Sequence, residues 1–298
     1  MFNPGVSHWI NTDGDTLIGY RRIGTGAVVV GDPIGPPTKW PQIVTQFESQ
    51  FDRVTWFGAS EQFAKIAPPF SGRCRVPIGF QTVVDPHQWA RIKTENADIR
   101  YQIGRSRRKG IIVRRATPSD GPPIQRCLAE WQHTKSPIKL YFMTDPEIAI
   151  HPDTRPVWIA EQDRTIQGYL VASPIPFRNG WLLEQWVRSP TAPNGVIEHM
   201  VDHAITELHQ RGALYVTMGL CPLTPSPNKP TSFSIQCLFA TARLATSWFY
   251  RPRSLTRFKL KFGFPSHEPI YAVFSGTFTM PRSAIDTLLA FMTAPKKC

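Results

Sequence analysis

The chain has 298 residues, of which 41% are apolar, and this composition indicates a packed core and excludes a disordered chain. Its length favours about two domains, and no run of about 18 apolar residues is present, so no segment is expected to span a bilayer. The net charge of +12 favours polyanionic partners, nucleic acid or anionic lipid, although plain solubility is the alternative.

Cysteine usage and the N-terminus both favour a cytoplasmic protein. The five cysteines are scattered, odd in number and without a CxxC pair. This argues against a disulfide framework and against a zinc cluster. The N-terminal residues lack the basic flank and apolar stretch of a secretory signal.

The first part of the chain alternates predicted strands and helices. Two strands around a Gly-Thr-Gly turn are predicted over 16–30, a helix over 39–51 and a strand over 53–60. Residues 81–92 and 99–110 then lead to a basic boundary near Gly110.

The second part repeats this order. The pattern predicts strands at 110–116, 181–188, 213–223 and 269–278, a hairpin over 156–175 that turns at Asp163-Arg164, and helices at 124–134, 234–250 and 281–292. The clearest helix starts at Gly195, because its apolar residues follow the spacing of one buried face, with Asn194 as the expected N-cap and Gly212 as the stop.

This shared order predicts a mixed α/β chain of two tandem domains, residues 1–110 and 111–298. The junction after the strand at 181–188 is the most informative. Acetyl-CoA transferases of the GNAT superfamily bind the pyrophosphate of CoA at such a turn through bare backbone N–H groups. Here the turn contains Pro190 and Pro193, which have no N–H to donate. A GNAT-like fold that uses a donor other than CoA is therefore expected.

The strand before this turn carries unexpected charges. In a regular strand Glu184, Trp186 and Arg188 share one face, and Gln185 and Val187 the other. Charged residues in an apolar strand are costly unless they are partnered. Glu184 and Arg188 either line a polar cavity, with Arg188 holding a carbonyl or phosphate oxygen, or form a salt bridge at a sheet edge.

Five segments, by their order and spacing, carry a family resemblance: "GDPIGP" at 31, "IRYQIGRSRRKG" at 99, "VRSPTAPNGVIEHMVDHAI" at 187, "TMGLCPL" at 217 and "FYRPRSLTRFKLKF" at 249. Through them the chain resembles the soluble catalytic domain of bacterial phosphatidylglycerol lysyltransferases (multiple peptide resistance factor) and alanyl-phosphatidylglycerol synthases. The resemblance implies two fused GNAT-like domains that move an amino acid from aminoacyl-tRNA to a lipid hydroxyl without CoA.

The chain departs from the family in the strand at 181–188. The family usually has Asp-Leu-Met-Arg where this chain has Gln185, Trp186, Val187 and Arg188. The resemblance implies that the missing acid holds the ammonium group of the amino acid, and a bulge in the strand would turn Glu184 toward that role. The family's Gly-Leu is Ser254-Leu255 here, and its membrane-embedded flippase region has no counterpart in the 298 residues.

An aminoacyl ester is already activated, so positioning and electrostatics are expected to supply most of the barrier reduction. The chain accordingly has no Gly-x-Ser-x-Gly motif. The candidate catalytic residues are Arg188, for contact with the oxyanion or ester, and Glu184, for ammonium recognition or proton transfer. Gln185 is a candidate for substrate binding.

Further substrate-binding candidates lie in a basic and aromatic segment: Lys259, Lys261, Arg257 and Tyr250. They suit the phosphate of a lipid or the acceptor stem of a tRNA, and the alternative is a solvated helix face. The resemblance favours the lipid phosphate, with Lys259 closest to the family's lysine. A second basic cluster, residues 105–110 with Arg114 and Arg115, is predicted to follow the tRNA or to be a charged surface between domains.

A zinc site is not expected. His199 and His203 are spaced i, i+4 with Asp202 nearby, but no HExxH motif is present, and a solvated helix face is the favoured interpretation. No metal or other cofactor, no CoA and no DNA are predicted.

The sequence therefore predicts a cytoplasmic, peripherally membrane-associated aminoacyltransferase that uses aminoacyl-tRNA and a lipid hydroxyl such as that of phosphatidylglycerol. Two alternatives remain open. One keeps the donor and changes the acceptor to a peptide, a peptidoglycan precursor or a sterol-like alcohol. The other is a non-catalytic module that binds RNA or a membrane. An ordinary acyl-CoA acetyltransferase is a further alternative, which the prolines in the turn disfavour.

Overall fold

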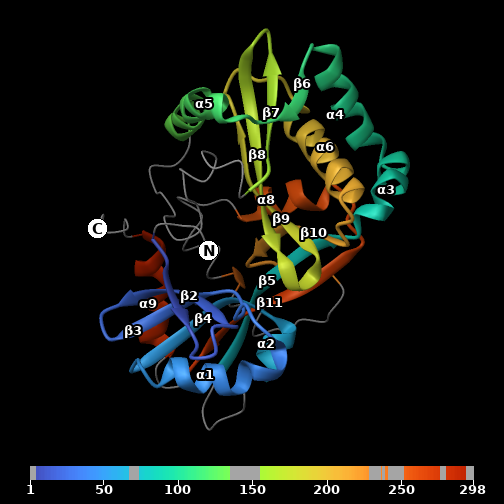
Figure 1. Cartoon of the computed structure of the whole chain (residues 1–298). Coiled ribbons are helices and arrows are strands. Elements are labelled where there is room, and N and C mark those ends of the chain that lie inside the picture. Colours follow the sequence, from blue (N-terminus) through green and yellow to red (C-terminus); the bar gives the residue numbers. More distant parts are fainter. Residues whose placement is uncertain are drawn as a thin grey trace.

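The computed structural model describes residues 5–66, 74–134, 155–227, 236, 239–240, 252–275 and 280–292. Its strands form one sheet of 11 strands in the order β1-β2-β3-β4-β11-β5-β10-β9-β8-β7-β6 (Figure 1). The pairs β3–β4 and β9–β10 are parallel and the other neighbouring pairs are antiparallel.

The elements of the first part follow the order of the sequence prediction. They are β1 (Ser7–Ile10), β2 (Leu17–Ile23), β3 (Gly26–Val30), α1 (Trp40–Glu48), β4 (Arg53–Ser60), α2 (Glu61–Ile66), β5 (Cys74–Val84), α3 (Trp89–Glu95) and α4 (Ala97–Arg108). The predicted hairpin, helix and strand correspond to β2–β3, α1 and β4. The basic segment before Gly110 is helix α4, which begins at the side-chain cap of Asn96 on the Ile99 N–H.

The second part contains β6 (Ile112–Arg115), α5 (Gly121–His133), β7 (Val157–Gln162), β8 (Thr165–Ile175), β9 (Gly180–Arg188), α6 (Val196–Gln210), β10 (Tyr215–Pro222), α8 (Pro252–Leu260), β11 (Ser266–Phe274) and α9 (Met280–Met292). The hairpin β7–β8 turns at Asp163 and Arg164, which both have positive φ, as a two-residue type I′ turn requires. Most of the helix predicted at 234–250 lies outside the described residues.

Helix α6 confirms the predicted amphipathic helix with one change at its start. Its N-cap is Gly195, with φ of 96°, instead of Asn194. Gly212 follows its end with φ of 78°, as expected for a C-terminal stop.

The mixed α/β fold is confirmed, but the prediction of two tandem domains is wrong, because the chain forms a single domain. Strand β11, near the end of the chain, inserts between β4 and β5 of the first part and pairs with both. Strand β5 in turn pairs with β10. Backbone hydrogen bonding thus runs unbroken through both parts. The boundary after residue 110 corresponds to the turn between α4 and β6, and its role as a boundary stays a prediction.

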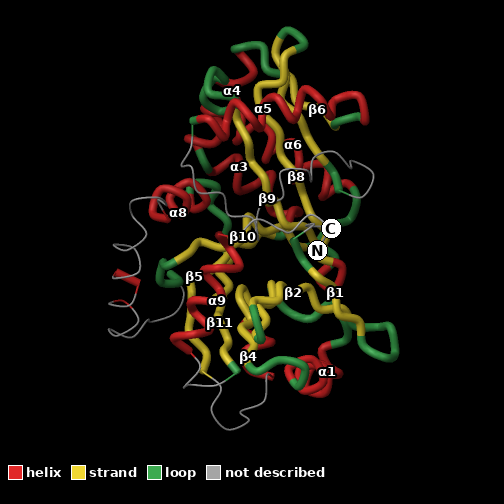
Figure 2. Tube along the Cα trace, turned by 90° about the vertical axis from the view of Figure 1, so that its left-hand side faces the viewer, coloured by secondary structure: helices red, strands yellow, loops and turns green. Residues whose placement is uncertain are grey.

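Helices cover both faces of this sheet. The largest core cluster packs α6, α3 and α8 against β6–β10, whereas α5 covers the opposite face of β7–β9. Helices α1 and α2 cover the first part of the sheet, and α9 packs against β2–β4. Both views place α5 and α9 on the same side of the molecule (Figures 1 and 2).

Candidate functional site

The sheet opens between β9 and β10. These parallel strands pair only at Gly180–Tyr215, Trp181–Val216 and Leu182–Thr217, although β9 continues to Arg188 and β10 to Pro222. Each strand carries a bulge at the point where pairing ends. A bulge bends its strand and increases the local twist, so the two bulges account for the separation of strands that would otherwise stay paired.

The bulge in β9 lies at Glu184. Against β8, Val171 pairs with Gln185 and Ala172 pairs with Leu183, so Glu184 is the extra residue. The regular alternation expected from the sequence is therefore broken at this point. Leu183 and Trp186 both pack toward the α6 side. Val187 packs toward α5 on the other side.

The bulge in β10 lies at Met218 and Gly219, which together oppose a single residue of β5. Gly219 has φ of 72°, and a Cβ there would come within 3.1 Å of the Leu182 side chain and 3.9 Å of Lys259 Nζ. The positive φ therefore favours glycine at this position, and a larger residue would also have to displace the Leu182 side chain. Because Gly219 has no side chain, β10 lies close to Lys259 Nζ at this point.

Lys259 reaches the opening between these strands from α8. Lys259 is only 5% exposed, and its Nζ donates a hydrogen bond of 2.7 Å to the backbone oxygen of Leu220. Nζ also lies 5.4 Å from the centre of the Trp186 ring. Burial lowers the pKa of Lys259 to about 8, because a low-dielectric environment disfavours the charged amine. A buried cation thus lies where the two strands part.

Glu184 lies in a second polar group. Its carboxylate accepts a hydrogen bond from Ser173 Oγ on β8 and lies 3.5 Å from Nη1 of Arg155. The Arg155 side chain is only 4% exposed and that of Glu184 19%. Sequence analysis missed Arg155, because a single arginine before an apolar strand carries no periodic signal. Its role depends on the contact with Glu184, 29 positions later in the numbering.

Gln185 is buried and accepts a hydrogen bond of 3.3 Å from Tyr169 Oη. Burial raises the pKa of the Tyr169 hydroxyl, which therefore stays protonated as a donor. The amide fits this place better than a carboxylate, since an uncharged group is less costly to bury. The buried position beside a tyrosine hydroxyl therefore suits the neutral amide of Gln185.

Arg188 lies apart from these groups. Its Nη1 donates a hydrogen bond of 2.9 Å to Asn194 Oδ1, in the turn that leads into α6. Arg188 lies four positions after Glu184 along the strand, which corresponds to about 13 Å. The structure therefore does not bring the two candidate catalytic residues together, and the role of each stays a prediction.

The remaining substrate-binding candidates separate as well. Lys261 Nζ is 2.9 Å from Glu198 Oε1 and 3.2 Å from Asp98 Oδ2, so it links the C-terminal side of α8 to α6 and α4. Burial alone would lower the pKa of Lys261, but these carboxylates raise it overall. Arg257 is exposed on α8. Tyr250 lies outside the described residues.

The turn between β9 and α6 is occupied by another helix. A Cβ on Gly195 would come within 2.1 Å of the backbone oxygen of Gln102, so α4 packs directly on the start of α6. The first turn of α6 also carries Glu198, which pairs with Lys261. The backbone of α4 therefore covers the start of α6.

The second basic cluster divides into two sets. Arg114 is bound by Asp120 and Glu161, and Arg115 lies 3.8 Å from Glu207 and over the Trp158 ring. These two arginines are structural. Arg105, Arg107, Arg108 and Lys109 remain on α4 and its C-terminal cap, where residues 107–109 are exposed; these four residues are the α4 basic cluster. Of these, Arg107 also lies 3.7 Å from Asp202.

The expectation of a solvated face at His199 and His203 is wrong for His199, which is buried, whereas His203 is half-buried. Asp202 is buried and accepts hydrogen bonds from Trp89 Nε1 at 2.9 Å and Lys93 Nζ at 2.8 Å. Burial, with the nearby charge of Arg107, lowers the pKa of His199 to about 4. Within the described part of the chain, no group of three His, Cys, Asp or Glu side chains is close enough to hold a metal ion.

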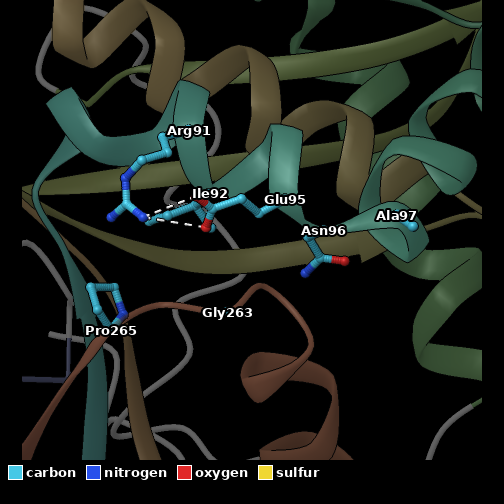
Figure 3. Close-up of a pocket in the computed structure, with 7 residues that line it drawn as sticks. All are labelled: Arg91, Ile92, Glu95, Asn96, Ala97, Gly263 and Pro265. Carbon is cyan, nitrogen blue, oxygen red and sulfur yellow. Dashed lines mark hydrogen bonds and ion pairs between the residues drawn. The ribbon is translucent and has the colours of Figure 1, made fainter.

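A surface cavity beside α3 lies away from the predicted catalytic and substrate-binding residues. Figure 3 shows this cavity of about 460 Å³ beside α3, the start of α4 and the loop after α8, and it is lined by Arg91, Ile92, Glu95, Asn96, Ala97, Gly263 and Pro265. An ion pair of 3.1 Å between Arg91 and Glu95 lies along it. None of the predicted site residues lines this cavity, so it gives them no support.

Comparison with known proteins identifies the family. The family model described as "Phosphatidylglycerol lysyltransferase, C-terminal" matches residues 1–274. The chain belongs to this family. The resemblance recognised in the sequence is therefore confirmed.

Curated relatives agree with this assignment. The lysylphosphatidylglycerol biosynthesis bifunctional protein LysX of Nocardia farcinica is 25% identical over 294 residues, covering 93% of this chain and 25% of that protein. The protein of the same name from Rhodococcus opacus is 27% identical over 218 residues, covering 69% and 19%. The chain thus spans a quarter or less of the length of these curated relatives.

Two solved structures share the fold. One is the C-terminal domain of a protein described as a lysylphosphatidylglycerol synthetase from Agrobacterium fabrum, with a TM-score of 0.78, 18% identity, and 99% of this chain and 92% of that one covered. The other is L-PGS from Bacillus licheniformis, with a TM-score of 0.76, 16% identity, and 97% and 90% covered. The fold is therefore shared across nearly the whole chain.

Within this family, the sequence departures gain a structural context. Gln185 occupies a buried position with a tyrosine partner, and the neighbouring Glu184 is displaced by the bulge onto Arg155 and Ser173. The lysine recognised in the sequence, Lys259, is the buried cation at the opening between β9 and β10.

Proposed function

We propose that this chain transfers an aminoacyl group from an aminoacyl-tRNA to the hydroxyl of an anionic lipid such as phosphatidylglycerol. Family membership and the printed names of the LysX relatives support the reaction class. The observation that carries the proposal is the buried Lys259 at the opening between β9 and β10. Its ammonium group is suited to hold the phosphate of the acceptor lipid in a low-dielectric setting.

The reaction is an ester exchange. The oxygen of the lipid hydroxyl attacks the carbonyl carbon of the aminoacyl ester, the bond from that carbon to the ribose oxygen breaks, and the hydroxyl proton passes to the ribose oxygen. No protein nucleophile is needed, and the chain's contribution is positioning and charge stabilisation. Glu184, held by Arg155 and Ser173, is our candidate for the ammonium group or the proton transfer, and Arg188 for the ester oxygen.

Two features support tRNA over CoA as donor. Gln102 of α4 packs against Gly195 at the start of α6, and the turn before it contains Pro190 and Pro193, so backbone N–H groups are scarce where a pyrophosphate would bind. The α4 basic cluster offers charge for the phosphates of an RNA stem. We expect the chain to act as a cytoplasmic, peripherally membrane-associated protein, and no helix of the described residues is long and apolar enough to cross a bilayer.

The test uses total tRNA charged with mixed amino acids, a lipid extract and mass spectrometry of the products. We expect aminoacylated phosphatidylglycerol, and we expect ribonuclease treatment of the donor to abolish it. Lys259→Met is expected to lose transfer. The matched control is Lys65→Met, which removes an exposed lysine of α2 whose partner is Glu61, and it is expected to transfer normally.

Other outcomes separate the alternatives. If the aminoacyl group is found on a peptide, a peptidoglycan precursor or a sterol-like alcohol and not on phospholipid, the assignment of the donor stands and the assignment of the acceptor changes. Binding of RNA or vesicles without transfer to any acceptor would indicate a non-catalytic module. Transfer that resists ribonuclease and requires CoA thioesters would refute the proposal. For Arg188, full activity of Arg188→Ala with normal tRNA binding would remove its assigned role.

A further inference from the structure

Helix α9 exposes three large aliphatic side chains and buries two polar ones. Three large aliphatic residues, Ile285, Leu288 and Leu289, are 57%, 52% and 42% exposed. Ser283 and Asp286 are instead buried against the sheet. The three aliphatic residues, at i, i+3 and i+4, form one stripe on the outer face; they are the α9 stripe.

The inner face of α9 is firmly attached, so this orientation is a property of the fold. Arg53 on β4 forms a two-point contact with Asp286, at 2.5 Å to Oδ2 and 3.2 Å to Oδ1. Arg21 donates a hydrogen bond of 2.8 Å to the backbone oxygen of Ala290. The Phe291 ring packs edge-on against Phe57 at 5.0 Å. Rotation of the helix that buried the stripe would break all three contacts.

We propose that the α9 stripe inserts into the interfacial layer of an anionic lipid bilayer and docks the chain on the membrane. This inference rests on the proposed function, because the acceptor is a membrane lipid. A helix of 13 residues is about 20 Å long, which suits a helix lying in the plane of the interface. Arg282, exposed one turn before Ile285, supplies a cation beside the aliphatic residues. Lys296 and Lys297 follow the helix in sequence.

Size and chemistry favour a lipid surface over the other occupants of an apolar face. A stable interface with a second copy of the chain takes roughly 20–30 residues on each side, whereas the stripe has three aliphatic residues. An RNA is held by cations and stacking aromatic rings, and aliphatic side chains offer it neither. Aliphatic side chains beside cations, on a chain of net charge +12, are complementary to anionic lipid.

The position of α9 suits the delivery of an acceptor. The helix packs against β2, β3 and β4, and β11 and β5 separate β4 from β10 in the sheet. Three strand spacings correspond to about 14 Å. Within the sheet, the strands under α9 therefore lie near β10, which borders the opening beside Lys259. In both views α9 is on the same side of the molecule as α5 (Figures 1 and 2).

The test measures sedimentation of the full chain with vesicles of phosphatidylcholine containing phosphatidylglycerol. The variant is the double substitution Ile285→Asn with Leu288→Asn. We expect it to bind at least about tenfold more weakly than the wild type. The matched control is Leu214→Asn, which removes an aliphatic side chain that is 64% exposed between α6 and β10, and it is expected to bind as the wild type does.

Transfer assays separate this proposal from the proposed function. With a short-chain, water-soluble phosphatidylglycerol as acceptor, the double variant should match the wild type, and with vesicles it should transfer more slowly. Equal vesicle binding by variant and wild type would overturn the docking role of α9. A dimer by light scattering that the double variant converts to a monomer would overturn it in favour of a second copy. The remaining outcome is that neither the wild type nor the double variant transfers to either acceptor, while vesicle binding still depends on the α9 stripe. That result would refute the proposed function and leave the docking role of α9 standing.

Discussion

Substituting Lys259 by methionine should stabilise the fold near neutral pH. Methionine has a similar length and no charge, so the change removes the cost of burying an ammonium group. That cost can be worked from the pKa of Lys259, which burial lowers from 10.5 to about 8. At 1.36 kcal/mol per pKa unit, the difference corresponds to about 3 kcal/mol. The lost hydrogen bond to the Leu220 oxygen offsets about 1 kcal/mol of it.

The pH dependence of the free energy of unfolding tests whether the buried ammonium group is the cause of this difference in stability. Between about pH 8 and 10.5 the unfolded wild type binds a proton at Lys259 that the folded state does not, so wild-type stability rises with pH through this window. The methionine variant lacks this contribution. The advantage of the variant should therefore be largest at pH 7 and should shrink by about 3 kcal/mol by pH 10.5.

The assay is urea denaturation of both proteins at pH 7 and pH 10.5, with the change in unfolding free energy compared pairwise. Lys261→Met is the control, two residues further along. The pKa of Lys261 is raised by its carboxylate partners, so its stabilising contribution is fully present below 10.5 and is lost only above that pH. This variant should be less stable at both pH values. A Lys259→Met advantage that does not change with pH would refute the reasoning.

Three further predictions follow from packing and charge. Gly195→Ala should lower the free energy of unfolding by at least about 2 kcal/mol, because φ at Gly195 is 96° and a Cβ would meet the Gln102 oxygen. The control is Gly212→Ala, where a Cβ would have no atom within 4 Å, and it should cost less in the same thermal unfolding experiment. Because the folded pKa of His199 is about 4, wild-type stability should fall as pH decreases from 6.5 to 4, and denaturation of His199→Gln over that range should show a shallower fall. Arg108→Gln should weaken tRNA binding and reduce the salt dependence of the binding constant by about one counterion, and an unchanged slope in a filter-binding titration would exclude Arg108 from RNA contact.

Much of the local structure could be predicted from the sequence. The apolar spacing of α6, the Asp163-Arg164 turn and the strands at 53–60 and 181–188 all follow from side-chain periodicity and turn chemistry. These signals are local, since each residue's preference acts on its own turn of helix or its own strand. The family was recognisable for a related reason: several short segments keep their order and spacing along the chain.

The site itself depends on contacts between residues distant in sequence. Lys259 was recognised as a candidate, but only packing shows that its amine is buried under the Leu220 oxygen. Glu184 and Arg188 would share one face of a regular strand, and the single bulged residue at Glu184 cancels that argument, since each shift of one position reverses the facing of a strand.

The sequence by itself therefore determined the family, the α/β character and the amphipathic faces of individual elements. The tertiary structure alone decided that β11 joins the two parts into one sheet, that α4 covers the start of α6, and that Arg155 holds Glu184. The physical reason is that periodicity reports which face of an element is apolar. It does not report which distant element covers that face, because this choice depends on the packing of the whole chain.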